Sequence, residues 1–136
     1  MGDRIVRVLT TILMVGLGGA IGAMMRVTLT AAINLASIGP WKLGTLAVNL
    51  AGCFLFGLVW ARADMKLELE TPATIALLGG FLGSFTTFST FAFQTTELTR
   101  QADYALAAIN LITHNGLGIA MVFAGIAVAK GITQVG

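Results

Sequence analysis

The sequence predicts an all-α membrane protein with four transmembrane helices, and two observations carry this prediction. Apolar residues make up 57% of the 136 residues and charged residues only 10%, with a mean hydropathy of +0.90; soluble domains carry about 25% charged residues. The charges also leave four gaps long enough for the roughly 20 apolar residues that cross a bilayer as a helix. Because backbone groups in lipid need internal partners, we expect helices and not open sheet. The gaps lie between residues 7 and 26, 42 and 62, 70 and 97, and 103 and 130.

The four gaps place the spans near residues 8–33, 43–61, 72–96 and 104–129. The connections are then only a few residues long, so residues 1–136 are expected to form a single four-span domain with no soluble domain. The first apolar run is too long for a signal peptide and continues beyond Arg26, which predicts that it is retained as a span. The net charge of +2 is spread over short loops and gives no footprint for nucleic acid.

Basic residues give only a weak preference for one orientation in the membrane. Four spans put both termini on one side, and Arg26 lies within a span. The side with both termini has five Lys and Arg residues and the other side has two. This difference favours termini on the cytoplasmic side but also permits insertion in both orientations. The five are Arg4, Arg7, Arg62, Lys66 and Lys130, and the two are Lys42 and Arg100.

Small residues within the spans predict close helix packing. Gly18 and Gly22 form a small-xxx-small pair in the first span, a pattern that lets helix backbones approach each other in lipid. Cys53 is the only cysteine, so it cannot form a disulfide within the chain, and we expect a small buried hydrophobe.

The third span contains an unusual segment, GSFTTFSTFAF at residues 83–93, with five hydroxyl side chains and four phenylalanines. Glycine and hydroxyl residues at the centre of a span predict a broken helix, whose freed carbonyl groups would suit a hard cation. On a continuous helix Phe85, Phe88 and Phe91 would share one face. The alternative is an aromatic packing stripe, with hydroxyls that bond to the preceding turn.

Polar side chains also lie deep in the second and fourth spans, where they are costly and tend to face a bundle interior or a wet cavity. None of them is acidic. Amide and hydroxyl donors without carboxylates favour an anion as the solute, and aromatic ring edges, which carry the positive end of the quadrupole, add to this. For His114, a hydrogen-bonded core residue and a protonatable group on an anion path are both open. The deep polar residues are Asn49 in the second span and Asn110, Thr113, His114 and Asn115 in the fourth. In the fourth span, Asn110, His114 and Gly118 are spaced by four and share one face, with Thr113 and Asn115 beside it.

Three segments together resemble the Fluc (CrcB) family of fluoride channels: GGAIGAMMR at 18–26, GTLAVNLAG at 44–52 and GGFLGSFTTFSTF at 79–91. The resemblance extends over all four spans. It implies a passive, fluoride-selective channel in the bacterial inner membrane that exports fluoride and lowers its intracellular concentration. It further implies an antiparallel, dual-topology homodimer with two pores and a central structural sodium ion. The implied partners are fluoride, sodium, membrane lipid and a second copy of the chain.

The resemblance also implies roles for individual residues. Asn49 would hydrogen-bond fluoride, and the ring edges of Phe88 and Phe91 would meet the ion from the partner subunit. Arg26 would concentrate anions near a pore vestibule, with a snorkelling interfacial anchor as the alternative. The remaining residues are Thr87, Ser89 and Thr90, which would supply hydroxyls, and Gly83 and Thr86, whose backbone carbonyls would hold sodium, two from each subunit.

The fit to the family pattern is imperfect in places. Gln94 stands where some relatives carry glutamate, so a vestibule carboxylate is not expected here. Asn110 lies on the line of deep polar residues at a position where relatives often have Tyr or Asn. His114 lies on the same line where relatives often have Ser.

Two other functions compete with this interpretation. A small multidrug transporter is also dimeric and has four spans, but it needs a carboxylate in its first span, where this chain has only Arg26 as a charge. An accessory membrane subunit remains an alternative. An enzyme is not expected, because the sequence offers no nucleophile with its base, no ligand cluster and no phosphate loop.

Overall fold

The computed structural model describes residues 2–37 and 43–134, and their regular secondary structure is helical. Four helices are long and apolar enough to cross a membrane, which confirms the four predicted spans. The second, third and fourth begin at the predicted residues, whereas the first is longer at both ends. Their bounds are Gly2–Ala36, Leu43–Met65, Pro72–Arg100 and Tyr104–Ile132.

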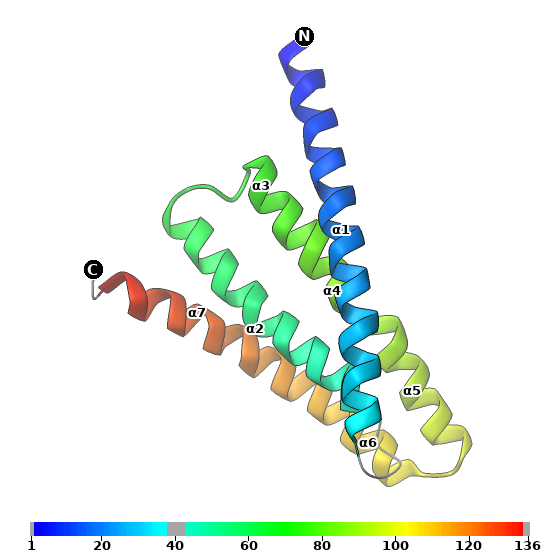
Figure 1. Ribbon diagram of the computed structural model, residues 1–136. Helices are drawn as coiled ribbons and strands as arrows, with labels where there is room; N and C mark the ends of the chain where they lie inside the picture. Colours follow the sequence, from blue (N-terminus) through cyan, green and yellow to red (C-terminus); the bar gives the residue numbers. More distant parts are fainter. Residues whose placement is uncertain (1, 38–42, 135–136) are drawn as a thin grey trace.

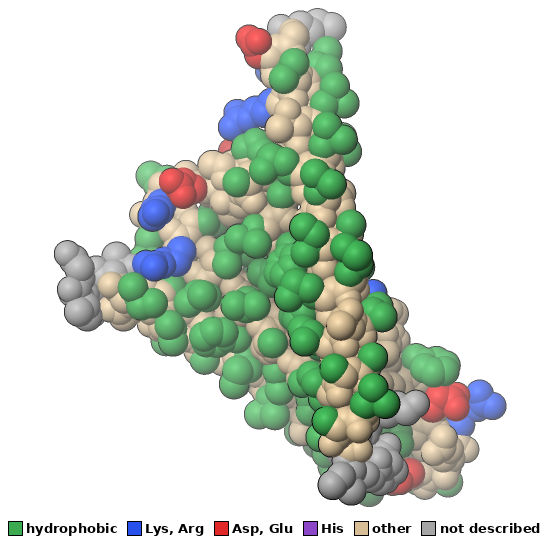
Figure 2. All heavy atoms as spheres, viewed as in Figure 1, with side chains coloured by type: hydrophobic (Ala, Val, Ile, Leu, Met, Phe, Trp, Pro, Cys, Tyr) green, Lys and Arg blue, Asp and Glu red, His purple; other side chains and the backbone are tan. Residues whose placement is uncertain are grey.

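The first two spans are continuous helices, α1 (Gly2–Ala36) and α2 (Leu43–Met65). At the end where they approach each other, the Gly44 N–H donates to Asn34 Oδ1 at 2.8 Å. Charged side chains gather near the helix ends, while the face seen in Figure 2 is mostly hydrophobic. This distribution suits a protein whose middle lies in lipid.

The third span is built from four helical pieces. It comprises α3 (Pro72–Ile75), the π-helical segment η1 (Ala76–Leu82), α4 (Gly83–Phe85) and α5 (Phe88–Arg100). Between α4 and α5 the backbone is extended, with φ −89° and ψ 161° at Thr86 and φ −149° and ψ 109° at Thr87.

The fourth span also contains a π-helical segment. Asp103 is the N-cap that precedes the span, and its side chain accepts a hydrogen bond from the Leu106 N–H at 3.2 Å. The span then runs through α6 (Tyr104–Ile112), η2 (Thr113–Leu117) and α7 (Gly118–Gln134).

The helices pack in pairs: α2 lies along α7, α1 lies against η1 and α4, and α5 lies beside α6 (Figure 1). Glycine permits two of these contacts. A Cβ atom on Gly57 would overlap the carbonyl of Val122 in α7, and one on Gly125 would overlap the carbonyl of Phe54 in α2. In lipid no hydrophobic effect drives helices together, so van der Waals contact at such close backbone approach stabilises the helix pair.

The predicted small-residue pair of the first span makes the α1 contact with η1. A Cβ on Gly22 would overlap the Phe81 carbonyl, and one on Gly18 would lie 3.0 Å from the Ala76 carbonyl oxygen. Across the same interface, a Cβ on Gly80 would lie 2.7 Å from the Val15 carbonyl oxygen. The expectation that Gly18 and Gly22 allow close packing is confirmed.

Candidate functional site

The extended backbone between α4 and α5 is held by a side chain of α2. In a continuous α-helix the Thr87 N–H would donate to the Gly83 carbonyl. Here it donates to Asn49 Oδ1 at 2.8 Å, and Asn49 Nδ2 donates to the Thr87 carbonyl at 3.1 Å. Asn49 thus satisfies both backbone groups of Thr87, as a neighbouring strand would. One of its two amide hydrogens remains for another acceptor.

Arg26 holds the other side of the interruption. Its Nε donates to the Ser84 carbonyl at 3.0 Å, across the contact between α1 and α4. In a continuous helix that carbonyl would accept from the Phe88 N–H. Arg26 is half-buried, and it therefore supplies the hydrogen bond that the end of α4 would otherwise lack.

Three hydroxyl side chains meet where α5 begins. Thr87 is the N-cap, and its Oγ1 accepts from the Thr90 N–H at 3.2 Å. The same oxygen lies 3.0 Å from Thr90 Oγ1 and 3.2 Å from Ser89 Oγ. The structure thus brings together the three residues expected to supply hydroxyls. They lie at a helix N-terminus, which favours negative charge.

The same hydrogen bonds affect the two carbonyl groups expected to bind a cation. The α-helical donor for the Gly83 carbonyl is Thr87 N–H, which is bonded to Asn49, and the donor for the Thr86 carbonyl is Thr90 N–H, which is bonded to Thr87 Oγ1. Gly83 is exposed and Thr86 is half-buried. In the described part of the chain, no group of three His, Cys, Asp or Glu side chains could hold a metal ion.

The phenylalanines divide at the interruption instead of forming one continuous face. Phe85 is buried and stacks on Phe81, with ring centroids 5.8 Å apart and an interplanar angle of 9°. Phe88 and Phe91 instead form an edge-to-face pair on α5, at 5.4 Å and 66°. Phe88 is 76% exposed, whereas Phe91 is only 6% exposed.

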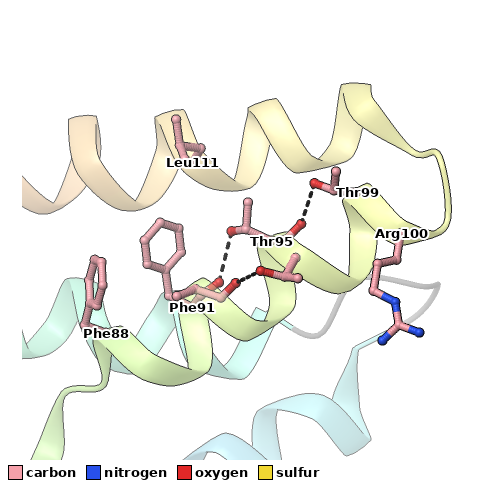
Figure 3. A pocket seen from close by; sticks show the side chains of 8 residues that line it. Phe88, Phe91, Thr95, Thr99, Arg100 and Leu111 are labelled. Carbon is pink, nitrogen blue, oxygen red and sulfur yellow. Dashed lines mark hydrogen bonds between the residues drawn. The ribbon is translucent and has the colours of Figure 1, made fainter.

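Phe88 and Phe91 line a groove of about 350 Å³ between α5 and α6 (Figure 3). The threonines of this groove turn their hydroxyls back to the helix: Thr95 donates to the Phe91 carbonyl at 3.0 Å, and Thr99 donates to the Thr95 carbonyl at 2.9 Å. Because the hydroxyl hydrogens are used in this way, the groove wall is formed largely by rings and methyl groups. Arg100 lies at the far end of the wall.

Two of the polar residues predicted on the fourth span, Asn110 and His114, contact α5 at Phe91 and one turn beyond it. Asn110 is buried, and its Nδ2 donates to Thr95 Oγ1 at 2.9 Å. The His114 ring stacks on the Phe91 ring, with centroids 4.5 Å apart and an angle of 28°, and its Nδ1 bonds to the Asn110 carbonyl at 3.0 Å. Thr95 was not anticipated from the sequence, although it lies one helical turn after Phe91.

A second contact that the sequence did not indicate joins α5 to α2. Gln94 Nε2 donates at 3.0 Å to Oγ1 of Thr45, which is 1% exposed. The neutral amide at the position that departs from the family pattern thus pairs with a buried hydroxyl.

Comparisons with known proteins agree over all four spans. Residues 13–126 match the family described as "CrcB-like protein, Camphor Resistance (CrcB)". The chain is 42% identical over 118 residues to a protein of Nitrosococcus oceani named "Fluoride-specific ion channel FluC", covering 85% of this chain and 93% of that one. A protein of the same name from Solidesulfovibrio magneticus shows the same identity and coverage, and one from Geobacter sulfurreducens is 34% identical over 122 residues, 90% of this chain and 98% of its own. The chain therefore belongs to the CrcB family and is a multi-pass protein of the cell membrane.

Proposed function

We propose that this protein is a passive, fluoride-selective ion channel that exports fluoride across the cytoplasmic membrane and so lowers its concentration inside the cell. The observation that carries the proposal is the family match at residues 13–126, which includes the whole segment of hydroxyls and rings at 79–91. Relatives aligned over most of both chains are named fluoride-specific channels. The protein is a channel and not an enzyme.

Fluoride passes along α5, where donors and ring edges lie next to each other. Ring edges carry the positive end of the quadrupole, and those of Phe88 and Phe91 meet the ion from the partner subunit. Asn49 contributes the amide hydrogen that Thr87 does not use. The hydroxyls of Thr87, Ser89 and Thr90 lie at the adjacent helix N-terminus. Asn110 and His114 complete the site behind Phe91.

The working unit is an antiparallel homodimer with two pores. Phe88 is 76% exposed in the single chain, and its ring reaches the ion only when a second chain closes the path. The weak asymmetry of Lys and Arg, five against two, is compatible with insertion in both orientations.

A structural sodium ion binds at the centre of this dimer. The carbonyl oxygens of Gly83 and Thr86, two from each chain, would hold it, and hard oxygen ligands suit such a cation. The fit is supported by the hydrogen bonds that occupy the usual helical donors of both carbonyls. The ion would neutralise the partial negative charge of these oxygens.

Arg26 draws anions toward the path. One of its five guanidinium N–H groups is used on the Ser84 carbonyl, and the positive charge of the side chain remains. It thereby combines attachment of α4 with electrostatic attraction.

Fluoride efflux from liposomes that contain the purified protein, followed with a fluoride electrode, tests the proposal. We expect rapid fluoride efflux, strong exclusion of chloride and no requirement for a proton gradient. Equal rates for the two anions, or efflux only with a proton gradient, would contradict passive fluoride selectivity.

Replacing sodium tests the cation site separately. At constant ionic strength, exchange of sodium for a bulky organic cation should lower the thermal stability of the detergent-solubilised dimer, because the carbonyls lose their ligand. An unchanged melting temperature would contradict the sodium site while leaving the flux experiment valid.

A further inference from the structure

The orientation of the His114 ring is fixed at two points. A backbone carbonyl can only accept, so the hydrogen in the contact with Asn110 belongs to His114 Nδ1. The face of the same ring lies on Phe91 at 4.5 Å. Both contacts arise where the fourth span passes from α6 into η2, a π-helical turn of the kind often found at functional sites.

The hydrogen bonds continue from Asn110 back to Phe91. Asn110 Nδ2 donates to Thr95 Oγ1 at 2.9 Å, and Thr95 Oγ1 donates to the Phe91 carbonyl at 3.0 Å. His114, Asn110 and Thr95 thus form a closed circuit that begins at the ring of Phe91 and ends at its backbone. Two of the links join α5 to the fourth span, one spans a turn of α5, and one lies within the fourth span.

This circuit determines which part of the Phe91 ring an anion can approach. Ring faces carry negative partial charge and ring edges positive partial charge, so a face repels fluoride and an edge attracts it. The imidazole covers one face of Phe91, and Phe88 lies against Phe91 at 66°. At 6% exposure, Phe91 has little room to turn a face toward the groove.

The same geometry makes His114 a poor fluoride ligand. With the hydrogen on Nδ1, Nε2 carries a lone pair, which repels an anion. This nitrogen is buried and has no hydrogen-bond partner among the residues that the structure describes. An unpaired buried acceptor is unfavourable, so the value of the imidazole here lies in the ring that it stacks on Phe91.

We propose that His114, Asn110 and Thr95 are positioning residues for Phe91, which hold its ring so that an edge faces the fluoride path. They act on the ion through Phe91 and not as ligands. The inference rests on the proposed channel function and assigns a role to the circuit within that site.

Two substitutions of His114 separate a stacked ring from a ligand. His114→Phe keeps a ring over Phe91 and removes every nitrogen, whereas His114→Leu removes the ring as well. We expect fluoride efflux of His114→Phe to stay within about threefold of the parental rate. His114→Leu should lose about tenfold or more, together with discrimination against chloride, because small displacements of a positioned group are costly. Equal losses in the two variants would overturn the proposal.

Thr95→Val tests the circuit with a change of similar shape. It removes the hydroxyl that links Asn110 to the Phe91 carbonyl, and we again expect a loss of about tenfold in efflux. The matched control is Thr28→Val on α1, where an exposed threonine donates to the Met24 carbonyl at 2.9 Å. Parental efflux in Thr95→Val would overturn the proposal.

A measurement without transport distinguishes failure of this inference from failure of the channel function. The carbon-13 spectrum of labelled phenylalanine in the intact protein reports whether the Phe91 ring is fixed. We expect one ordered ring signal in the parental protein and in His114→Phe, and an averaged or broadened signal in Thr95→Val. An unchanged ring signal in Thr95→Val would overturn positioning even if the parental protein conducts fluoride. A parental protein that passes no fluoride would overturn the channel function instead.

Discussion

Phe88 and Phe91 are one helical turn apart on α5, but their different exposure separates an effect on transport from an effect on stability. Phe88 is 76% exposed in the single chain and meets Phe91 edge to face, so Phe88→Ile removes little contact that is buried within the chain. Phe91 is buried beneath His114, so its substitution should affect both transport and stability. Side-chain exposure therefore makes Phe88 the cleaner probe of the ion path.

Phe88→Ile should abolish most fluoride transport while the protein still purifies as a dimer. Loss of an electrostatic contact of about 2–3 kcal/mol at the barrier slows passage some thirty- to a hundredfold. Phe91→Ile should lose as much transport and should also lower the melting temperature. Liposome efflux and thermal unfolding measure the two effects. A well-folded Phe88→Ile protein that conducts at the parental rate would return this segment to an aromatic packing role.

Asn49 has a structural task in addition to its proposed contact with fluoride, and two substitutions separate these tasks. Asn49→Asp keeps an acceptor for the Thr87 N–H but removes the amide donor and places a carboxylate beside the anion path. It should fold and conduct little. Asn49→Leu leaves both backbone groups of Thr87 unpaired and should lower stability by about 1–3 kcal/mol as well. Parental efflux in Asn49→Asp would exclude a role for the amide in conduction.

At the scale of the elements, glycine decides which helices can pack closely. Gly125→Ala would place a methyl group on the carbonyl of Phe54 and should push α7 away from α2. We expect a loss of about 1–3 kcal/mol of stability, typical of overpacking. Gly16→Ala on α1 is the control, because nothing lies within 4 Å of its added methyl group. Thermal unfolding in detergent compares the two. Equal stability of both variants would contradict the close approach of α2 and α7.

The third span shows how side chains from other elements shape a helix. Asn49 from α2 and Arg26 from α1 supply the hydrogen bonds that the backbone between α4 and α5 would otherwise make within the span. Thr87 then restarts the helix as an N-cap. Exposed backbone in a membrane must find partners within the protein, and α1 and α2 provide them here together with the N-cap of α5.

At the scale of the whole molecule, the proposed dimer requires that the chain insert in both orientations. Cys53→Ser combined with Ala102→Cys gives a single cysteine in the connection between α5 and α6, where Ala102 is exposed. A membrane-impermeant thiol reagent should label about half of the protein from each side of the membrane, because the bias of Lys and Arg is weak. Labelling from one side alone would contradict dual topology.

The sequence by itself determined the four spans, because the transfer of a segment into lipid depends on its own composition. The uncharged gaps gave the starts at residues 43, 72 and 104 that the structure confirms, and the resemblance over all four spans gave the family. The close packing of Gly18 and Gly22 was also predictable, since the small-xxx-small pattern is local.

Only the tertiary structure decided which polar group meets which. Three contacts depend on side chains from separate helices. Asn49 pairs with the backbone of Thr87, Thr95 links Asn110 to Phe91, and His114 stacks on Phe91. The expected ring face divides because the extended residues Thr86 and Thr87 rotate α5 relative to α4. Helical periodicity places residues on a face of their own helix, whereas hydrogen bonds and ring contacts between helices depend on crossing angle and register, which no single segment encodes.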